Sequence, residues 1–420
     1  MIKKIIVSFS LLAASVAFAQ ENNASPYSYY GIGDVKFKGT AENRAMGGLG
    51  ILSDSIHLNL QNPASYSALK FTTFSIAAST SSTTFKTSSG NDDASRTTVD
   101  YLAVGLPVNN LAFAFGLMPY SAVGYKIRNS VIDDNGFERA RRFEGSGGLN
   151  RVFLGASYNI TPKFSLGADF QYNFGDIETR SAVSIPGLEY STRELNNSDY
   201  SGFSFNIGAI YKTRLKEKYD WYTSATYTPA GTLNSSTERE LATIYYSRSG
   251  NEIVVEKLGV RSFDGDVKTP SKISLGSGIG QNLKWFAGVE YTFQESNELG
   301  NRFDNITNAG FEQSHKVAVG GYYIPRYMSF SSYLSRVTYR AGFKYEKTGL
   351  VVNGESINDY GVSFGMGLPL GSYIGSSNLN IGVEYGKRGT TNANLVQENY
   401  VNLFVSLSLN DKWFVKRKYD

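Results

Sequence analysis

Apolar and polar side chains alternate along much of this chain. Between Phe164 and Phe174 every second residue is apolar, and the residues between them are small or polar: Ser165, Gly167, Asp169, Gln171 and Asn173. A period of two residues indicates a strand with one apolar and one polar face. The same split recurs in 283–293 and 337–346, and further alternating segments lie near 70–80, 96–107, 111–124, 149–160, 198–215, 219–242, 252–280, 311–323, 358–370, 377–388 and 398–409.

So many strands with one apolar face cannot all be buried in a soluble core. Beyond the first 19 residues, no apolar run approaches the roughly 18 to 20 residues that a membrane-spanning helix requires. A closed sheet satisfies its backbone groups inside lipid without such a run. The pattern therefore predicts an all-β fold, a transmembrane antiparallel β-barrel of about 14 strands.

The connections between these strands differ in length, and this orients the barrel. Short connections at 109–110, 160–162 and 280–282 are typical of periplasmic turns. Longer polar stretches at 82–95, 126–147, 181–197 and 297–310 are expected to be extracellular loops, and 229–269 an extended hairpin above the outer surface. A basic patch on the second loop offers a contact for lipopolysaccharide; it comprises Lys126, Arg128, Arg139, Arg141 and Arg142.

Four segments are predicted along the chain. Residues 1–19 have the basic start, apolar core and small-residue end of a secretory signal peptide, which predicts export with cleavage near Ala19. Residues 20–69 lack any sustained period and are predicted to form a hatch or plug inside the barrel, whose wall is 70–409. Residues 410–420 form a periplasmic tail. Asn62-Pro63-Ala64 is predicted to be a turn, not part of a helix, where the plug meets the first wall strand.

Composition narrows the function classes. The 29 Tyr, 26 Phe and 43 Gly favour strands and close backbone approach, and Cys is absent, so disulfides and thiol chemistry are excluded. Without Lys3 and Lys4, 39 basic residues face 37 acidic ones, which argues against a nucleic-acid partner. His57 and His315 are the only histidines and no motif supplies a catalytic nucleophile, so we expect no enzyme, no cofactor and no metal.

Ionisable residues occupy inward-facing positions of several predicted strands. Their simplest role is to form ion pairs that brace the plug against the wall, since buried opposite charges generally pair. A substrate role is the alternative. These candidate lumen residues are Asp169, Lys212, Glu290, Arg340, Lys344 and Glu384.

Several short motifs resemble the FadL family of long-chain fatty-acid transporters. In the plug they are Gly31-Ile32-Gly33, Arg44-Ala45-Met46-Gly47-Gly48 and Asn62-Pro63-Ala64, and in the barrel they are Thr269–Gly276, Trp285 and Glu290-Tyr291. The resemblance implies a 14-stranded outer-membrane barrel of a Gram-negative bacterium, an N-terminal hatch, and diffusion of hydrophobic molecules through an opening in the wall. The hatch positions carried over are Gly31, Gly33, Arg44, Gly47, Gly48, Asn62, Pro63 and Ala64.

Two functions remain open at this point. The first is passive uptake of hydrophobic small molecules such as long-chain fatty acids. The second is a non-transporting scaffold barrel in an outer-membrane protein assembly, because the same family includes PorV-like subunits of type IX secretion. Lipid, lipopolysaccharide, a hydrophobic small molecule and partner proteins are the expected contacts. An apolar path to the wall would favour uptake, whereas charged pairs that hold the plug would favour the scaffold.

Overall fold

The wall is a closed antiparallel barrel. The computed structural model describes residues 23–132, 136–216, 218–302, 306–371 and 377–413. The predicted signal peptide (1–19) and the tail beyond residue 413 lie outside these residues. Among the described residues the sheet contains 18 strands. The closed ring itself has 14 strands, because β1, β9, β10 and β13 are not part of it. The last strand pairs with the first from Asp411↔Thr72 to Gln397↔Lys86, so the ring has no free edge at this seam.

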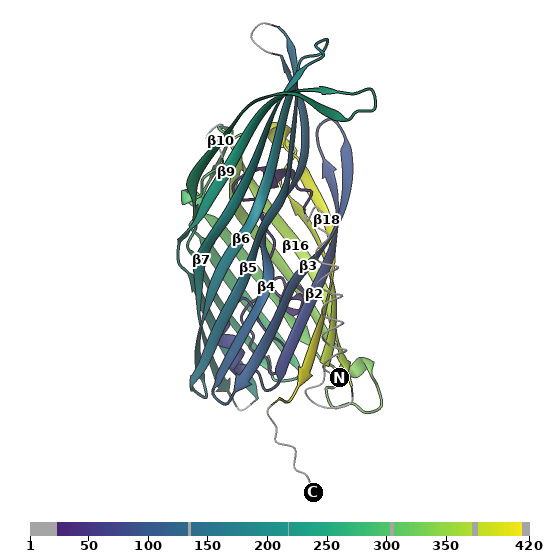
Figure 1. Cartoon of the computed structure of the whole chain (residues 1–420). Coiled ribbons are helices and arrows are strands. Elements are labelled where there is room, and N and C mark those ends of the chain that lie inside the picture. Colours follow the sequence, from purple (N-terminus) through teal and green to yellow (C-terminus); the bar gives the residue numbers. More distant parts are fainter. Residues whose placement is uncertain (1–22, 133–135, 217, 303–305, 372–376, 414–420) are drawn as a thin grey trace.

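The 14 wall strands run up and down in chain order (Figure 1). They are β2 (Thr72–Lys86), β3 (Asn91–Val108), β4 (Leu111–Ile132), β5 (Glu138–Thr161), β6 (Phe164–Ser184), β7 (Ser191–Leu215), β8 (Tyr219–Thr228), β11 (Lys272–Gln281), β12 (Trp285–Gln294), β14 (Ser314–Tyr323), β15 (Thr338–Val352), β16 (Glu355–Leu370), β17 (Ser377–Arg388) and β18 (Gln397–Asp411).

The remaining elements are short or lie outside the ring. They are β1 (Asp34–Val35), β9 (Gly231–Tyr246), β10 (Glu252–Thr269), β13 (Ala309–Phe311), α2 (Ala41–Arg44), and the 3-10 helices η1 (Pro26–Tyr29), η2 (Pro63–Ala68), η3 (Ser296–Glu298), η4 (Leu334–Arg336) and η5 (Asn392–Asn394). Among the described residues no helix is both long and apolar enough to cross a bilayer.

Side chains point as the alternation predicts, with the polar face inside. In β6, Phe170 is 45% exposed on the outer surface, whereas its neighbour Asp169 is 2% exposed in the lumen. In β7, Phe203 and Phe205 likewise face outward. An apolar exterior around a polar interior is the arrangement that a lipid environment stabilises.

The predicted loops at the upper end of the barrel are largely strand. The prediction of long loops at 82–95, 126–147 and 181–197 is wrong, because β2 to β7 continue upward and leave connections of only 87–90, 133–137 and 185–190. The basic patch therefore lies on paired strands, with Arg128 opposite Arg142. The upper parts of these strands have no apolar face. A polar stretch without such a face resembles a loop when only the sequence is considered.

The extended hairpin predicted at 229–269 is confirmed. β9 pairs with β10 from Gly231↔Thr269 to Tyr246↔Glu252 and with the upper part of β7 (Figure 1). Pro229 separates β8 from β9 and Pro270 separates β10 from β11, so both strands are interrupted at the same height. Proline lacks the N–H that a ladder requires, so this pair of prolines marks the boundary between wall and hairpin.

Candidate functional site

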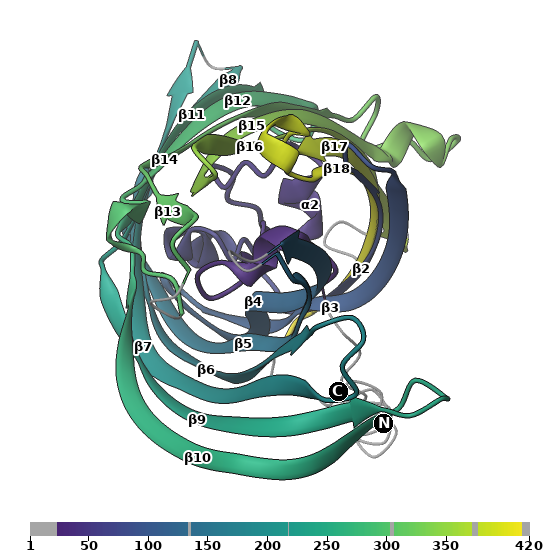
Figure 2. The same ribbon diagram turned by 90° about the horizontal axis from the view of Figure 1, so that it is seen from above.

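Residues 23–69 lie within the ring of strands (Figure 2). We call this described segment the plug. Its helix η2 contacts β5, β6 and β7, and α2 contacts β16, β17 and β18, so the plug contacts opposite sides of the lumen. Its side chains also complete apolar clusters with the wall, in which Tyr66, Leu49 and Ile51 are fully buried.

Two pairs of glycines in the wall lie in close contact with the plug, and we call each pair a glycine seat. Gly167 and Gly208 face each other on β6 and β7, and Gly320 and Gly342 face each other on β14 and β15. A Cβ on Gly342 would lie 2.1 Å from the backbone N of Gly47, and one on Gly167 would lie 2.5 Å from the carbonyl carbon of Pro63. At these four positions only glycine leaves room for the plug in its observed place.

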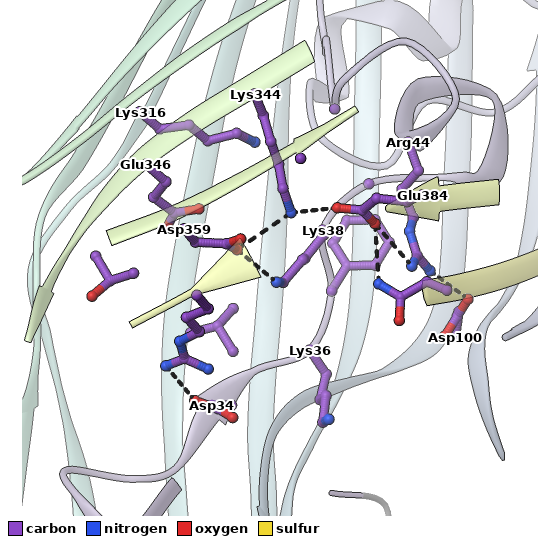
Figure 3. Close-up of a pocket in the computed structure, with 18 of the residues that line it drawn as sticks. Asp34, Lys36, Lys38, Arg44, Asp100, Lys316, Lys344, Glu346, Asp359 and Glu384 are labelled. Atoms are coloured by element: carbon purple, nitrogen blue, oxygen red, sulfur yellow. Dashed lines mark hydrogen bonds and ion pairs between the residues drawn. The ribbon is translucent and has the colours of Figure 1, made fainter. Parts of the chain in front are cut away.

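A cluster of opposite charges joins the plug to β15, β16 and β17 (Figure 3). Lys344 Nζ lies 2.5 Å from Glu384 Oε1 and 3.4 Å from Asp359 Oδ2. Lys38 from the plug also lies 3.4 Å from Asp359 Oδ2. The side chains of Lys344, Glu384 and Asp359 are 7% exposed or less, so each charge depends on its partners.

Further ion pairs join the plug to β3 and to β17. Arg44 Nη1 lies 2.9 Å from Asp100 on β3, and its Nη2 lies 3.6 Å from Glu384. Asp34 lies 2.8 Å from Arg388 on β17. Burial alone would raise the pKa of the Asp34 carboxyl. Attraction to Arg388 and Lys36 and hydrogen bonds from Arg388 and Asn23 together outweigh burial and lower this pKa to about 2. Asp34 therefore stays charged at neutral pH.

The Asn62-Pro63-Ala64 corner differs in detail from its prediction. It was predicted to be a turn and not part of a helix, but Asn62 caps the 3-10 helix that begins at Pro63. The Asn62 side chain accepts a hydrogen bond from the N–H of Ala64 and donates one to Ser224 Oγ on β8 at 2.9 Å. Pro63 suits the first helical position because its missing N–H is not needed there.

The cavity beside the plug has a mixed, strongly charged lining. A cavity of about 430 Å³ lies between the plug and the wall. Lysines, arginines and carboxylates from the plug and nine wall strands line it, together with apolar side chains such as Phe37 and Leu60.

In the described part of the wall, β3 and β4 separate locally. These strands pair only from Leu102↔Leu117 to Val108↔Leu111. Above this point β4 shifts register between Pro119 and Ser121 relative to β5. The plug strand β1 takes the vacated edge, where Val35 pairs with Ser121. The plug therefore covers the gap from inside.

Comparison with protein families decides the relationship. A family model described as BamG matches residues 1–420, which is the whole chain. The chain belongs to the BamG family. No curated protein sequence is detectably similar to this BamG-family chain.

Solved structures with a similar fold include two toluene transporters and a FadL homologue. The Ralstonia pickettii toluene transporter TbuX is 15% identical with a TM-score of 0.58, covering 89% of this chain and 99% of its own. The Pseudomonas putida toluene transporter TodX is 16% identical with a TM-score of 0.56, covering 90% and 99%. A Pseudomonas aeruginosa FadL homologue is 14% identical with a TM-score of 0.56, covering 88% and 98%. The predicted FadL-like barrel fold is thus confirmed for this BamG-family member.

The structure places the predicted hatch residues at contacts between plug and wall. Gly31 lies against Phe311, and Gly33 has a positive φ of 91° where the chain approaches Ala122. Gly47 donates its N–H to Ser363 Oγ at 3.0 Å, and Gly48 lies beside Lys316. Arg44, Asn62, Pro63 and Ala64 make the contacts described above.

The six predicted lumen charges all have polar partners, but only two share one cluster. Lys344 and Glu384 are those two. Asp169 accepts a hydrogen bond from Tyr66 at 3.1 Å, and Glu290 accepts one from the N–H of Gly50 at 2.9 Å. Arg340 bonds Asn380 at 3.0 Å, and Lys212 lies 3.2 Å from Asp220.

Several members of these ion pairs were not predicted from the sequence. Asp100, Asp359 and Arg388 were not singled out, although each lies on a strand whose outer face is apolar. The available signal was the two-residue period along β3, β16 and β17, which assigns these positions to the lumen side. The plug cations Lys38 and Arg44 gave no signal about which strand they meet.

Proposed function

We propose that this protein is a non-transporting scaffold barrel, a subunit of a protein assembly in the outer membrane of a Gram-negative bacterium. The observation that carries the proposal is the attachment of the plug. Ion pairs join it to β3, β16 and β17, and glycine seats fit it against β6, β7, β14 and β15. Release of such a plug would break the ion pairs that Asp100, Asp359, Glu384 and Arg388 make with plug residues, and breaking a buried ion pair is costly.

The charged lining of the lumen supports the same proposal. A hydrophobic solute gains free energy from apolar contact, whereas the cavity beside the plug presents ammonium, guanidinium and carboxylate groups. Desolvating these groups against an apolar ligand would cost more than the scattered apolar side chains return.

The edge of β10 is the surface best suited to a protein partner. β10 pairs with β9, and no strand pairs with its other edge in the described residues. Leu258, Val260 and Phe263 on β10 are 57%, 51% and 42% exposed. The hairpin continues from the upper ends of β8 and β11, and we expect it to stand beyond the lipid-facing band, where these apolar side chains would face water. An exposed strand edge with apolar side chains is a template for strand addition by another polypeptide.

Lysine substitutions on this edge test the scaffold function. We expect Leu258→Lys with Val260→Lys to reduce the size of the complex that contains the protein, because a charged edge opposes strand addition. The measurement is the migration of the protein on native gels after mild extraction from its own membranes. Thr232→Lys with Asn234→Lys on β9 is the matched control and should leave migration unchanged. A wild-type protein that migrates as a free barrel would contradict the proposal.

Uptake of a hydrophobic small molecule is the second candidate. The gap between β3 and β4 and the likeness in fold to proteins described as toluene transporters favour it. For passage, β1 would have to leave the edge of β4 or the plug would have to shift.

A disulfide between plug and wall separates the two candidates. Asn62 and Ser224 are in side-chain contact, and the chain has no native cysteine, so Asn62→Cys with Ser224→Cys creates a single defined pair. We expect the oxidised variant to support growth as well as the same variant under reducing conditions, because a scaffold does not require plug movement. The single variant Ser224→Cys controls for the loss of the hydrogen bond. Impaired uptake of a hydrophobic compound only in the oxidised double variant would instead support transport.

A further inference from the structure

The connection between β14 and β15 differs from the other connections at the lower end of the barrel. Those at 109–110, 162–163 and 282–284 are tight turns, whereas this one runs from 324 to 337. We call it the rim loop. Its ends are buried at Ile324 and Val337, and the N–H of Arg326 bonds the carbonyl of Ser335 at 2.8 Å, which closes its base. The light green loop projects sideways beyond the ring of strands near the lower end (Figures 1 and 2).

The tip of the rim loop is apolar and uncovered. Phe330 is 99% exposed, Leu334 is 67% exposed and Met328 is 61% exposed. Three large apolar side chains so close in sequence would be a liability in water. Their exposure therefore indicates that something other than water covers the tip in the membrane.

The rim loop is continuous with the lipid-facing surface of the wall. Tyr333 donates a hydrogen bond to the carbonyl of Pro369 on β16, and Tyr339 on β15 donates one to the carbonyl of Leu334. Two outward-facing residues of β16, Phe364 and Leu370, are 55% and 45% exposed. The apolar tip thus extends sideways from the lower margin of the band that contacts lipid.

The charge of the rim loop complements phospholipid headgroups. Residues 324–337 include Arg326 and Arg336 and no acidic residue. The Arg336 guanidinium lies over the Tyr333 ring at 5.3 Å. Apolar and aromatic side chains beside arginines are typical of segments that lie in a membrane interface, with rings below the headgroups and cations at the phosphates.

We propose that the rim loop is an interfacial anchor covered by phospholipid of the leaflet at the lower, periplasmic end of the barrel. Phe330, Met328 and Leu334 enter the acyl region, and Arg326 and Arg336 meet phosphate groups. The loop holds the barrel at a defined depth and widens its footprint in that leaflet. This role does not depend on whether the protein is a scaffold or a transporter.

A cysteine-free chain allows a direct test by site-specific labelling. Ser331→Cys places one fluorophore beside Phe330 in full-length protein reconstituted into phospholipid vesicles. Phe170→Cys on the outer wall is the lipid-exposed reference, and Lys163→Cys in a tight turn at the same end is the aqueous reference. We expect lipid-borne nitroxide to quench the label at 331 nearly as much as at 170 and far more than at 163.

Three further outcomes decide the proposal. Adding Phe330→Asn and Leu334→Asn to the Ser331→Cys protein should abolish the quenching while the barrel still migrates as a folded species in unheated gels. Quenching at 331 equal to that at 163 would overturn the proposal. If the label at 331 is unquenched by lipid in vesicles but is shielded from iodide in native membranes, a protein covers the tip and the lipid proposal is also overturned.

Discussion

Replacement of Lys344 by methionine is expected to lower the free energy of unfolding by about 3–5 kcal/mol. Methionine approximates the length of the side chain but leaves Glu384 with only Arg44 and Asp359 with only Lys38 as cationic partners. The measurement is the urea midpoint of unfolding in lipid vesicles.

Two variants control this experiment. Lys284→Met removes an exposed charge in a turn and should change stability by less than about 0.5 kcal/mol. The double variant Lys344→Met with Glu384→Gln should recover part of the lost free energy of unfolding, because it removes one of the two carboxylates that no longer pair with Lys344. Equal stability of Lys344→Met and the native protein would contradict the stabilising role of this charge cluster.

Replacement of Gly342 by valine is expected to displace the plug and raise the ion conductance of the barrel. The new Cβ would lie 2.1 Å from both the N of Gly47 and the carbonyl carbon of Met46, which are backbone atoms and cannot rotate aside. Overpacking of this kind costs about 1–3 kcal/mol, enough to shift a contact without unfolding the wall. Conductance is measured on single molecules in planar bilayers.

The matched control for this substitution is Gly310→Val, where an added Cβ meets nothing within 4 Å. It should conduct like the native protein. Gly320→Ala provides an independent test at the same seat, because its Cβ would lie 2.3 Å from the carbonyl oxygen of Met46. Native conductance and native stability in both seat variants would contradict the proposed tight fit of the plug.

The local sequence pattern was sufficient to predict the wall strands and the charged residues on their inner face. Phe170 and Asp169 were assigned to opposite faces because successive side chains on a strand point to opposite sides. The same rule placed Lys344 and Glu384 inside the lumen. It could not pair Lys344 with Asp359 and Glu384, because these residues come from three strands whose register depends on the whole sheet.

Features that depend on distant contacts escaped prediction. Pro119 is visible in the sequence, but the parting of β3 from β4 above it, and the use of β1 to cover that edge, require residues 34–35 and 121–122 to meet. Asn62-Pro63-Ala64 was correctly read as a break before the first strand, yet its 3-10 helix is stabilised by contacts of Asn62 with β8. The rim loop carries no periodic signal.

By itself the sequence determined that this protein is a barrel with an apolar outside, a charged lumen and a long hairpin beyond the wall. These properties follow from a two-residue period and from single prolines, whose effects depend on neighbouring residues in the chain. Only the tertiary structure decided that the plug is fastened by particular ion pairs and glycine seats, and that Phe330 projects outward from the rim. The physical reason is that such contacts join residues far apart in the chain, so they exist only after the ring has closed.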